Sequence, residues 1–221
     1  MKTTVPTKTY NQKQNPMNTN TNPVHQPTMF TSDVAFPQAA GISRKAFIGI
    51  DNGFTGGIAC LLPDGNVLTR PVSVIDLGKE RLLDLDRNRE WLRAMIDLAD
   101  VDRQNILAVF EQCQPNPKFG ARNNFTNGKN GEFWRLLLSL EGIPFRPVNP
   151  QQWQKWIFRG IRGDDTKAMA NLVRLQRFPK LDFTRYNRTQ VEGVNDAICI
   201  ALWASELSAC ITQTQATASV A

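Results

Sequence analysis

The sequence has little of what several common kinds of functional site require. Of its 221 residues only His25 is a histidine, and it lies in a polar stretch near the N-terminus. The four cysteines form no C-x-x-C pair and have no metal-ligand spacing: Cys60, Cys113, Cys199 and Cys210. We therefore expect neither zinc chemistry nor a histidine base in the core. Three of the cysteines lie in apolar runs, and we interpret them as buried thiols in a reducing compartment.

The sequence also lacks an apolar stretch long enough to span a membrane. Residues 1–44 are rich in Thr, Asn, Gln and Pro and poor in large apolar residues, which predicts a disordered N-terminal tail. The tail has no acid before Asp33, as in an organelle transit peptide, but it also has no arginine before Arg44, which argues against one. A cytoplasmic location is the expectation, and an organelle is possible but weakly supported.

Acidic residues are outnumbered. The chain has 26 Lys or Arg against 20 Asp or Glu, a formal net charge of +6, and its pI is near 9.4. Residues 111–190 carry 14 of these cations against 6 acids, a net charge of +8 for that part alone. An excess of positive charge favours an anionic partner, and nucleic acid is the first candidate.

What the sequence does contain is an apolar run that ends in a single carboxylate. The apolar run of residues 46–51 ends at Asp51 and is followed by Asn52-Gly53. A second apolar run covers residues 56–62. This pattern predicts a hairpin of two buried strands, with a third strand at about 67–74 after a turn. A carboxylate at the mouth of a buried strand is costly to desolvate unless a partner such as a cation compensates its charge.

The rest of the chain alternates between helical and strand patterns, which predicts an α/β domain with a five-stranded mixed sheet flanked by helices. The domain is expected over residues 45–208, with a flexible tail at 209–221. The expected helices are 88–99, 131–141, 151–158, 166–178 and 191–207, the remaining strands are 105–111 and 143–148, and the expected loops are 76–87 and 112–130. Strands 46–51 and 105–111 should lie side by side with their C-terminal ends at one crevice, where open α/β sheets bind ligands.

Four acids converge on that crevice in this arrangement. Asp51 and Glu111 each end an apolar run, and on adjacent parallel strands they would repel each other. Glu192 and Asp196 are four residues apart and so lie on one face near the start of the last helix. Three of these acids have an ordinary alternative interpretation. Asp51 could cap the hairpin turn, and Glu192 and Asp196 could complement the helix dipole. The convergence of all four favours a functional site.

The motifs around these acids resemble those of the RuvC-type Holliday-junction resolvases of the ribonuclease H-like superfamily, and look closest to the phage, bacterial and plant chloroplast branch. The matching pieces are Gly49-Ile-Asp51 with Gly56-Gly57, then Phe110-Glu111-Gln112, and Glu192-Gly-Val-Asn-Asp196-Ala. The resemblance covers about residues 46–207. It implies a ribonuclease H-like fold and a homodimeric, structure-selective endonuclease of DNA recombination and repair that cuts four-way junctions by paired nicks.

The resemblance also implies the parts of the site. Asp51, Glu111, Glu192 and Asp196 would be catalytic and would hold two Mg²⁺ ions, with Mn²⁺ as a substitute; hard cations take oxygen ligands. Some relatives place a histidine beside the last acid. This chain has no core histidine, so a lysine or a metal-bound water would serve in that role. Lys167 is the candidate lysine, because it lies in a region where related resolvases carry a lysine near the cleaved phosphate. No nucleotide cofactor is expected.

Cations, amides and one aromatic ring mark the expected DNA-binding surface, because such a mixture contacts phosphates and bases. We interpret Trp153 and Trp156 as residues that pack within the protein rather than as residues that stack on DNA bases. The apolar side of helix 131–141 is partly core, and the resemblance implies that it also forms a dimer. The expected DNA-binding residues are Lys118, Arg122, Asn124, Phe125, Lys129, Arg159 and Arg162.

Three alternatives remain at this stage. Another ribonuclease H-like nuclease would act on flaps, hybrids or transposon ends, and a non-cleaving relative would only bind DNA. The segment from Gly49 to Gly57 also resembles the phosphate loop of actin-like sugar kinases. That family needs two such domains and a second phosphate motif, for which about 175 folded residues leave no room.

Overall fold

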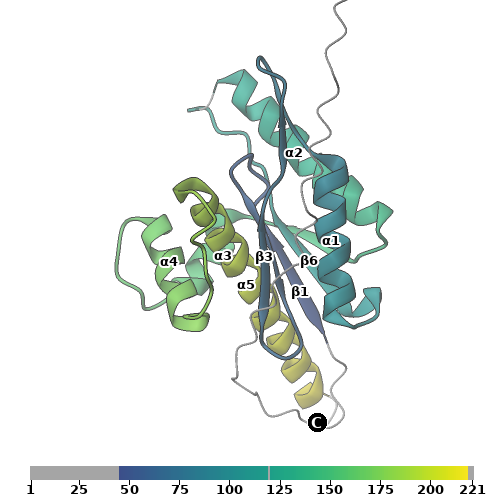
Figure 1. Ribbon diagram of the computed structural model, residues 1–221. Coiled ribbons are helices and arrows are strands. Elements are labelled where there is room, and N and C mark those ends of the chain that lie inside the picture. Colours follow the sequence, from purple (N-terminus) through teal and green to yellow (C-terminus); the bar gives the residue numbers. More distant parts are fainter. Residues whose placement is uncertain (1–44, 119, 219–221) are drawn as a thin grey trace, which may run out of the picture. The chain divides into compact units, whose positions relative to one another are not determined.

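The computed structural model describes residues 45–118 and 120–218, and the tail expected over residues 1–44 lies outside them. A five-stranded sheet organises the described chain, in the order β3-β2-β1-β6-β7 (Figure 1). Its strands are β1 Ala46–Ile50, β2 Gly57–Leu61, β3 Val67–Pro71, β6 Ile106–Glu111 and β7 Phe145–Val148. The expected meander of three strands is confirmed, since β2 pairs antiparallel with both β1 and β3.

Strand β1 also pairs in parallel with β6, and β6 in parallel with β7. The expectation that the two carboxylate-ending strands are neighbours is thus confirmed. The expected α/β domain with a five-stranded mixed sheet flanked by helices is therefore confirmed, and the sheet is antiparallel only at β2.

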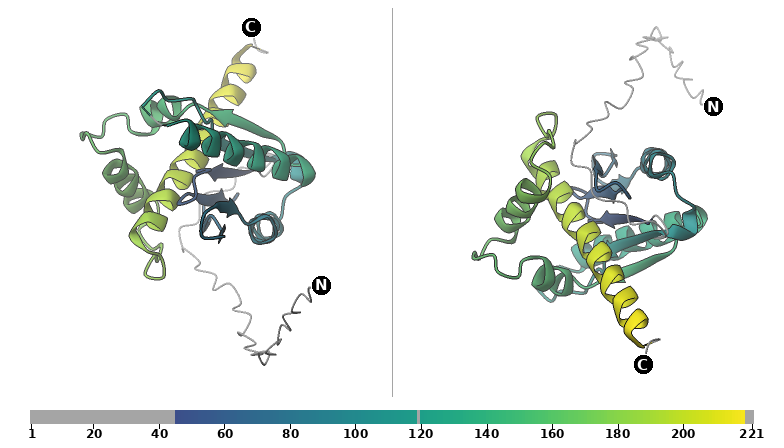
Figure 2. Two further views of the ribbon diagram at one scale, coloured as in Figure 1. Left: turned by 90° about the horizontal axis from the view of Figure 1, so that it is seen from above. Right: turned by 90° about the horizontal axis from the view of Figure 1, so that it is seen from below.

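The helices lie on both faces of the sheet (Figures 1 and 2). None of those described is long and apolar enough to cross a membrane. Helix α5 runs to Ala218, so its last turns overlap the tail expected at 209–221. The helices are α1 Leu85–Ala99, α2 Ala121–Leu140, α3 Pro150–Ile157, α4 Thr166–Arg177 and α5 Arg188–Ala218, with a short 3₁₀ turn at Arg103–Asn105.

Alternation along the strands builds two separate apolar layers, because successive side chains of a strand point to opposite faces. Ile48 and Ile50 of β1 pack with Leu92 of α1 and Trp134 of α2. On the other face, Phe47 of β1 packs with residues of α3, α4 and α5. Both faces of β1 are therefore buried, which explains why its sequence is an uninterrupted apolar run.

The loop expected at 76–87 is wrong. Its first half belongs to a small antiparallel hairpin of β4 Val74–Asp76 and β5 Arg81–Leu83, and its second half opens α1, which begins at Leu85. The sequence pattern did not reveal the hairpin because it contains several charged residues and adds little to the core. Its strands are also only three residues long. Asp84 ends the hairpin and caps α1, where its Oδ1 accepts from the Arg87 N–H at 3.0 Å.

The loop expected at 112–130 is also wrong from residue 121 onward, because α2 begins ten residues earlier than the apolar pattern indicated. Its first half is polar and mostly exposed, so it has no apolar stripe to reveal it. The far end of α2 is fixed by Glu141, a buried side chain that accepts hydrogen bonds from Arg89 and Arg93 of α1 at 2.5 and 2.9 Å. Burial alone would raise the pKa of Glu141, but these two guanidinium groups lower it to about 2.

Helix α5 lies directly on β1 because glycines remove the side chains between them. A Cβ on Gly49 of β1 would lie 2.1 Å from the backbone oxygen of Ala197, and one on Gly193 of α5 would lie 2.1 Å from the backbone oxygen of Thr55. Both contacts are far below the closest approach of real Cβ atoms, and backbone cannot yield as a flexible side chain does. This close packing is what brings the α5 acids to the end of β1.

Gly49→Ala is therefore expected to destabilise the protein by about 3 kcal/mol, at the upper end of the usual cost of overpacking. Gly128→Ala in α2 is the matched control, because a Cβ there meets nothing within 4 Å. The control should be neutral or more stable by about 0.5–1 kcal/mol, since alanine favours a helix over glycine. Urea unfolding followed by tryptophan fluorescence measures both, and equal stability of the two variants would contradict the close-packing argument.

Candidate active site

Two carboxylates meet at the C-terminal ends of neighbouring parallel strands. Ile50 of β1 is in register with Phe110 of β6, so the next residues along each strand, Asp51 and Glu111, emerge side by side. The Asp51 Oδ1 accepts from the Gly53 N–H at 3.1 Å, so this residue also caps the turn to β2. The turn-cap interpretation and the site interpretation of Asp51 are thus compatible.

Helix α5 adds a third acid to this edge. The helix starts after Asn187, whose Oδ1 accepts from the Gln190 N–H at 3.0 Å. The start is held beside the β1–β2 turn by a bridge between Gly56 and Gly193. Asp196 follows one turn later and is largely buried.

The pKa values of these acids report that they share one environment. Burial raises the pKa of Glu111 to about 7, and the nearby charge of Asp51 adds to that shift. Burial likewise raises the pKa of Asp51 and brings that of Asp196 to about 6, the latter despite the opposing charge of Lys167. Buried acids that repel one another hold protons unless a cation compensates them.

Lys167 is the cation that the described structure places among them. It lies in the first turn of α4, where its backbone N–H is capped by the Asp165 Oδ1 at 2.9 Å. Its ammonium group donates a hydrogen bond to the Asp196 Oδ2. Burial alone would lower the pKa of Lys167, but the charge of Asp196, with smaller effects of Asp51 and Glu111, raises it. Asp51, Glu111, Asp196 and Lys167 therefore form one interacting cluster.

Glu192 lies at the margin of this cluster. Its Oε1 accepts from the exposed Arg188 Nε at 2.9 Å, and its charge contributes to the raised pKa of Asp196. Among the described residues, no group of three or more acidic, histidine or cysteine side chains is arranged closely enough to hold a metal ion.

The donor set nevertheless fits hard divalent cations. Carboxylate oxygens are the ligands that Mg²⁺ takes. The raised pKa values of Asp51, Glu111 and Asp196 mean that burial disfavours their ionised forms, and a bound cation would offset that cost. The cation that serves in this structure is the Lys167 ammonium. Asp51, Glu111 and Asp196 are thus the residues that would hold Mg²⁺, and Glu192 would join them on leaving Arg188.

Sequence reasoning missed three residues that hold Glu111. Trp153 of α3, almost fully buried, donates its indole N–H to the Glu111 Oε1 at 3.1 Å, so it does more than pack. The Asn52 side chain donates to the Glu111 backbone oxygen at 2.6 Å and to the Cys113 Sγ at 3.1 Å. The Cys113 thiol in turn donates to the Asn127 backbone oxygen at 2.8 Å. In the sequence, only the position of Asn52 next to Asp51 could have indicated that one of these residues belongs to the site.

The expected DNA-binding residues of the α2 region lie together, but several are already engaged. Arg122 donates to the Lys79 backbone oxygen at 3.1 Å, and Lys129 pairs with Glu80 at 3.0 Å. Asn124 makes two hydrogen bonds with the Asn116 backbone and so shapes the turn before α2. Lys118 is exposed, and Phe125 has 68% of its surface exposed.

The other two expected DNA-binding residues lie after α3, away from this group. Arg159 donates to the Glu206 Oε2 at 3.1 Å and stacks over the Trp156 ring at 4.5 Å. Arg162 is exposed in the segment before α4. The charge of Arg159 is thus partly neutralised by Glu206.

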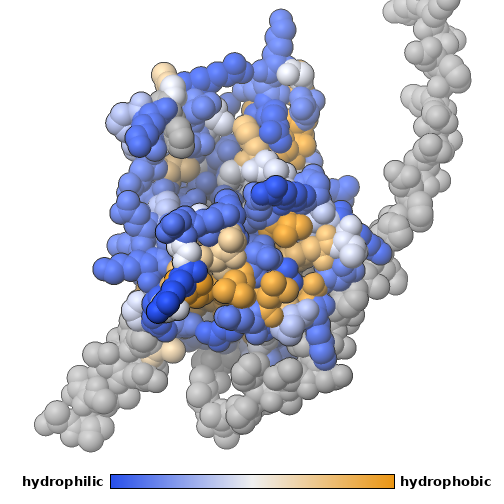
Figure 3. All heavy atoms as spheres, turned by 90° about the vertical axis from the view of Figure 1, so that its left-hand side faces the viewer, coloured by the Kyte–Doolittle hydropathy of each residue, from blue (hydrophilic) through white to orange (hydrophobic). Residues whose placement is uncertain are grey.

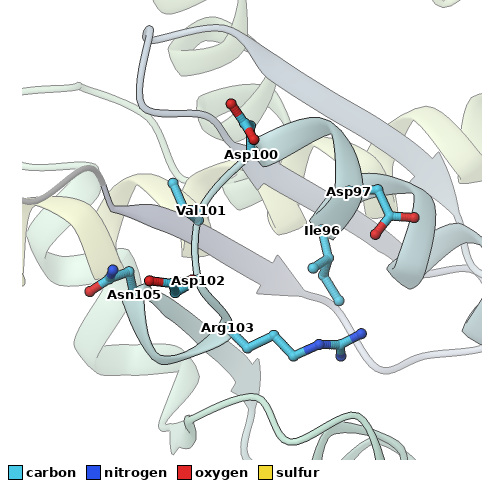
Figure 4. Close-up of a pocket in the computed structure, with 7 residues that line it drawn as sticks. All are labelled: Ile96, Asp97, Asp100, Val101, Asp102, Arg103 and Asn105. Carbon is cyan, nitrogen blue, oxygen red and sulfur yellow. The ribbon is translucent and has the colours of Figure 1, made fainter.

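Two hollows in the described surface lie apart from the carboxylate cluster. One of about 590 Å³ surrounds Asp100 and Arg103, before the N-terminal end of β6 and hence at the opposite end of that strand from Glu111 (Figure 4). The other, of about 190 Å³, lies between α3, α4 and α5 and includes Trp156 and Glu206. On the side of α3 and α4, apolar residues gather in a patch within a largely hydrophilic surface (Figure 3).

Comparisons with known proteins give a distant structural likeness. No protein-family model and no curated protein matches the chain. Among solved structures, the chain is similar to Thermus thermophilus RuvC, with 16% identity and a TM-score of 0.43 over 72% of this chain and 92% of that one. It is similar to T. thermophilus RuvC in complex with a Holliday junction substrate, with 12% identity and the same TM-score over 72% and 91% of the two chains.

Proposed function

We propose that this protein is a Mg²⁺-dependent endonuclease that resolves four-way DNA junctions by paired symmetric nicks. The observation that carries the proposal is the convergence of Asp51, Glu111 and Asp196, from three separate elements, around the Lys167 ammonium. Burying this much like charge is expensive, and a structural role would be served better by apolar residues. The cost is explained if the cluster binds cations and a phosphodiester.

Each residue of the cluster then has a role. Bound Mg²⁺ would activate the attacking water and stabilise the leaving 3′-oxygen of a phosphodiester. Trp153 and Asn52 hold Glu111 in place from its side chain and its backbone. Lys167 would release Asp196 as the metal binds, and its ammonium would then be free to donate to a phosphate oxygen of the scissile group.

A two-fold dimer would supply the second site that junction resolution needs. Leu136 and Leu140 of α2 have 62% and 70% of their surfaces exposed, and they lie four residues apart on one helix face. Pairing this face with its copy would bury both side chains, in agreement with the dimer that the resemblance implies. A closed two-fold interface uses the same surface on both subunits.

The substrate is tested with end-labelled four-way, flap and linear duplex DNA, each incubated with the full chain in Mg²⁺, in Mn²⁺ and in EDTA. We expect the four-way junction to be cut at two symmetric positions, in either metal and not in EDTA, with ends that a ligase can seal. Preferential cutting of the flap would favour another ribonuclease H-like nuclease. Tight binding of the junction without cutting in either metal would favour a non-cleaving relative.

A further inference from the structure

Two large apolar side chains are exposed on elements that contact each other, the β4–β5 hairpin and the first half of α2. Leu77 forms the tip of the β4–β5 hairpin and has 60% of its surface exposed, and Phe125 of α2 has 68% exposed. The turn is well defined, since the Leu77 N–H donates to the Glu80 oxygen at 2.8 Å and Gly78 adopts a φ of +79°. Leu77 is thus held outward by a regular turn, where it contributes nothing to the core.

The hairpin is fixed to α2 and to the turn that carries Asp51. Its Lys79 oxygen accepts from Arg122 and its Glu80 pairs with Lys129, which places the tip beside the first half of α2 (Figure 1). Its Arg81 stacks over the ring of Phe54, in the β1–β2 turn, at 5.0 Å. The hairpin therefore has a set position relative to the carboxylate cluster. The distance can be gauged along α2. Arg122, which contacts the hairpin, and Gly131, which lies against Cys113 just after Glu111, are nine residues or about 13 Å apart on this helix.

The charge around this tip favours nucleic acid as its partner. Residues 112–130 contain three cations, Lys118, Arg122 and Lys129, and no acid, while the hairpin residues 74–83 balance two cations against two acids. A stable protein interface buries about 800 Å² per partner around an apolar centre. The exposed apolar side chains here, Ile75, Leu77, Leu85 and Phe125, are few and lie among charged residues, so they do not form such a centre. Proteins that open DNA do use single apolar wedges flanked by cations that hold the phosphates.

We propose that Leu77 is a second apolar wedge, which contacts unstacked bases at the branch point of a DNA junction together with Phe125. This inference rests on the proposed function and deepens it, because it assigns a substrate-contacting role to the β4–β5 hairpin. Arg122 and Lys129 join the hairpin to α2, so the two wedges lie on elements that are held together.

The test uses the full chain with Leu77→Ser and a four-way junction that carries a fluorescent adenine analogue at its branch point, in EDTA so that nothing is cut. Wild type should raise the fluorescence on binding, because unstacking relieves quenching. Leu77→Ser should lose most of this rise, and its preference for the junction over linear duplex should fall about 10-fold, as for the loss of one base-stacking contact. Leu175→Ser on α4, an exposed leucine away from the hairpin, is the matched control and should behave as wild type.

Thermal unfolding should be alike for wild type and both variants, since Leu77 is outside the core. A Leu77→Ser protein with the full fluorescence rise and full junction preference would overturn the inference while leaving the proposed function intact. A change in its sedimentation with unchanged fluorescence would also overturn it, by placing Leu77 in a protein interface. Failure of wild type itself to distinguish the junction from duplex, in binding and in cleavage, would overturn both.

Discussion

Asp51→Asn and Glu111→Gln are each expected to lower the cleavage of four-way DNA by about 10³-fold or more while leaving junction binding nearly intact. Each change keeps the size of the side chain and removes one of the charges that would hold Mg²⁺. A loss of 10³-fold corresponds to about 4 kcal/mol of transition-state stabilisation, within the several kcal/mol that metal ions supply. Binding should persist because removing a negative charge does not weaken contacts with phosphates.

The same variants also separate a catalytic role from a structural one. The charge of Asp51 contributes to the raised pKa of Glu111, so Asp51→Asn should relieve repulsion in the metal-free protein and leave it at least as stable as wild type. Asp97→Asn, an exposed acid of α1, is the matched control and should cleave normally. Cleavage rates from denaturing gels and affinities from electrophoretic shifts decide the matter, and normal turnover in either site variant would remove the basis for the site.

A mixed dimer of one wild-type protomer and one Asp51→Asn protomer is expected to nick a junction once and not to resolve it. Each protomer should supply one complete site, and the two-fold axis of the dimer should match that of the two cleaved strands. Two differently tagged protomers allow the mixed dimer to be purified. A plasmid with an extruded cruciform distinguishes the products, because paired nicks give linear DNA and a single nick gives an open circle.

The mixed dimer should yield almost only open circles, whereas a tagged wild-type dimer should yield linear DNA. A mixed dimer with Asp97→Asn in place of the site variant controls for the tags and should also linearise the plasmid. Linear product from the Asp51→Asn mixed dimer at the wild-type rate would mean that one site cuts both strands. Open circles from the wild-type dimer would favour the flap or transposon interpretation over junction resolution.

The sequence alone was sufficient for the strand framework and the three central acids. Because β1 and β6 are buried on both faces, they are continuous apolar runs, and the acids that end them stand out against those runs. Helices α3 and α4 were also predicted to within two residues, since Pro150 and Asp165 mark their first turns. In these elements the residues that favour the local structure are also the residues that the tertiary packing requires, so the sequence pattern predicts the element.

The sequence did not reveal the β4–β5 hairpin or the first half of α2. The first half of α2 is polar, and the strands of the hairpin have only three residues each, with charged residues between the apolar ones. The two elements contact each other through Arg122 and Lys129. Hydrophobic periodicity reports burial in a core, so it is silent where two exposed elements support one another by polar contacts.

By itself, then, the sequence determined which elements carry Asp51, Glu111 and Asp196, because the position of an acid at the end of a buried element is a local property. Only the tertiary structure decided which neighbours these acids have: Lys167 of α4 on Asp196, and Trp153 of α3 on Glu111. The physical reason is that each of these contacts joins side chains from separate elements. The position of Asp196 beside β1 depends in turn on how closely α5 packs on β1. That distance is set by Gly49 and Gly193 against backbone atoms, through contacts that no local pattern encodes.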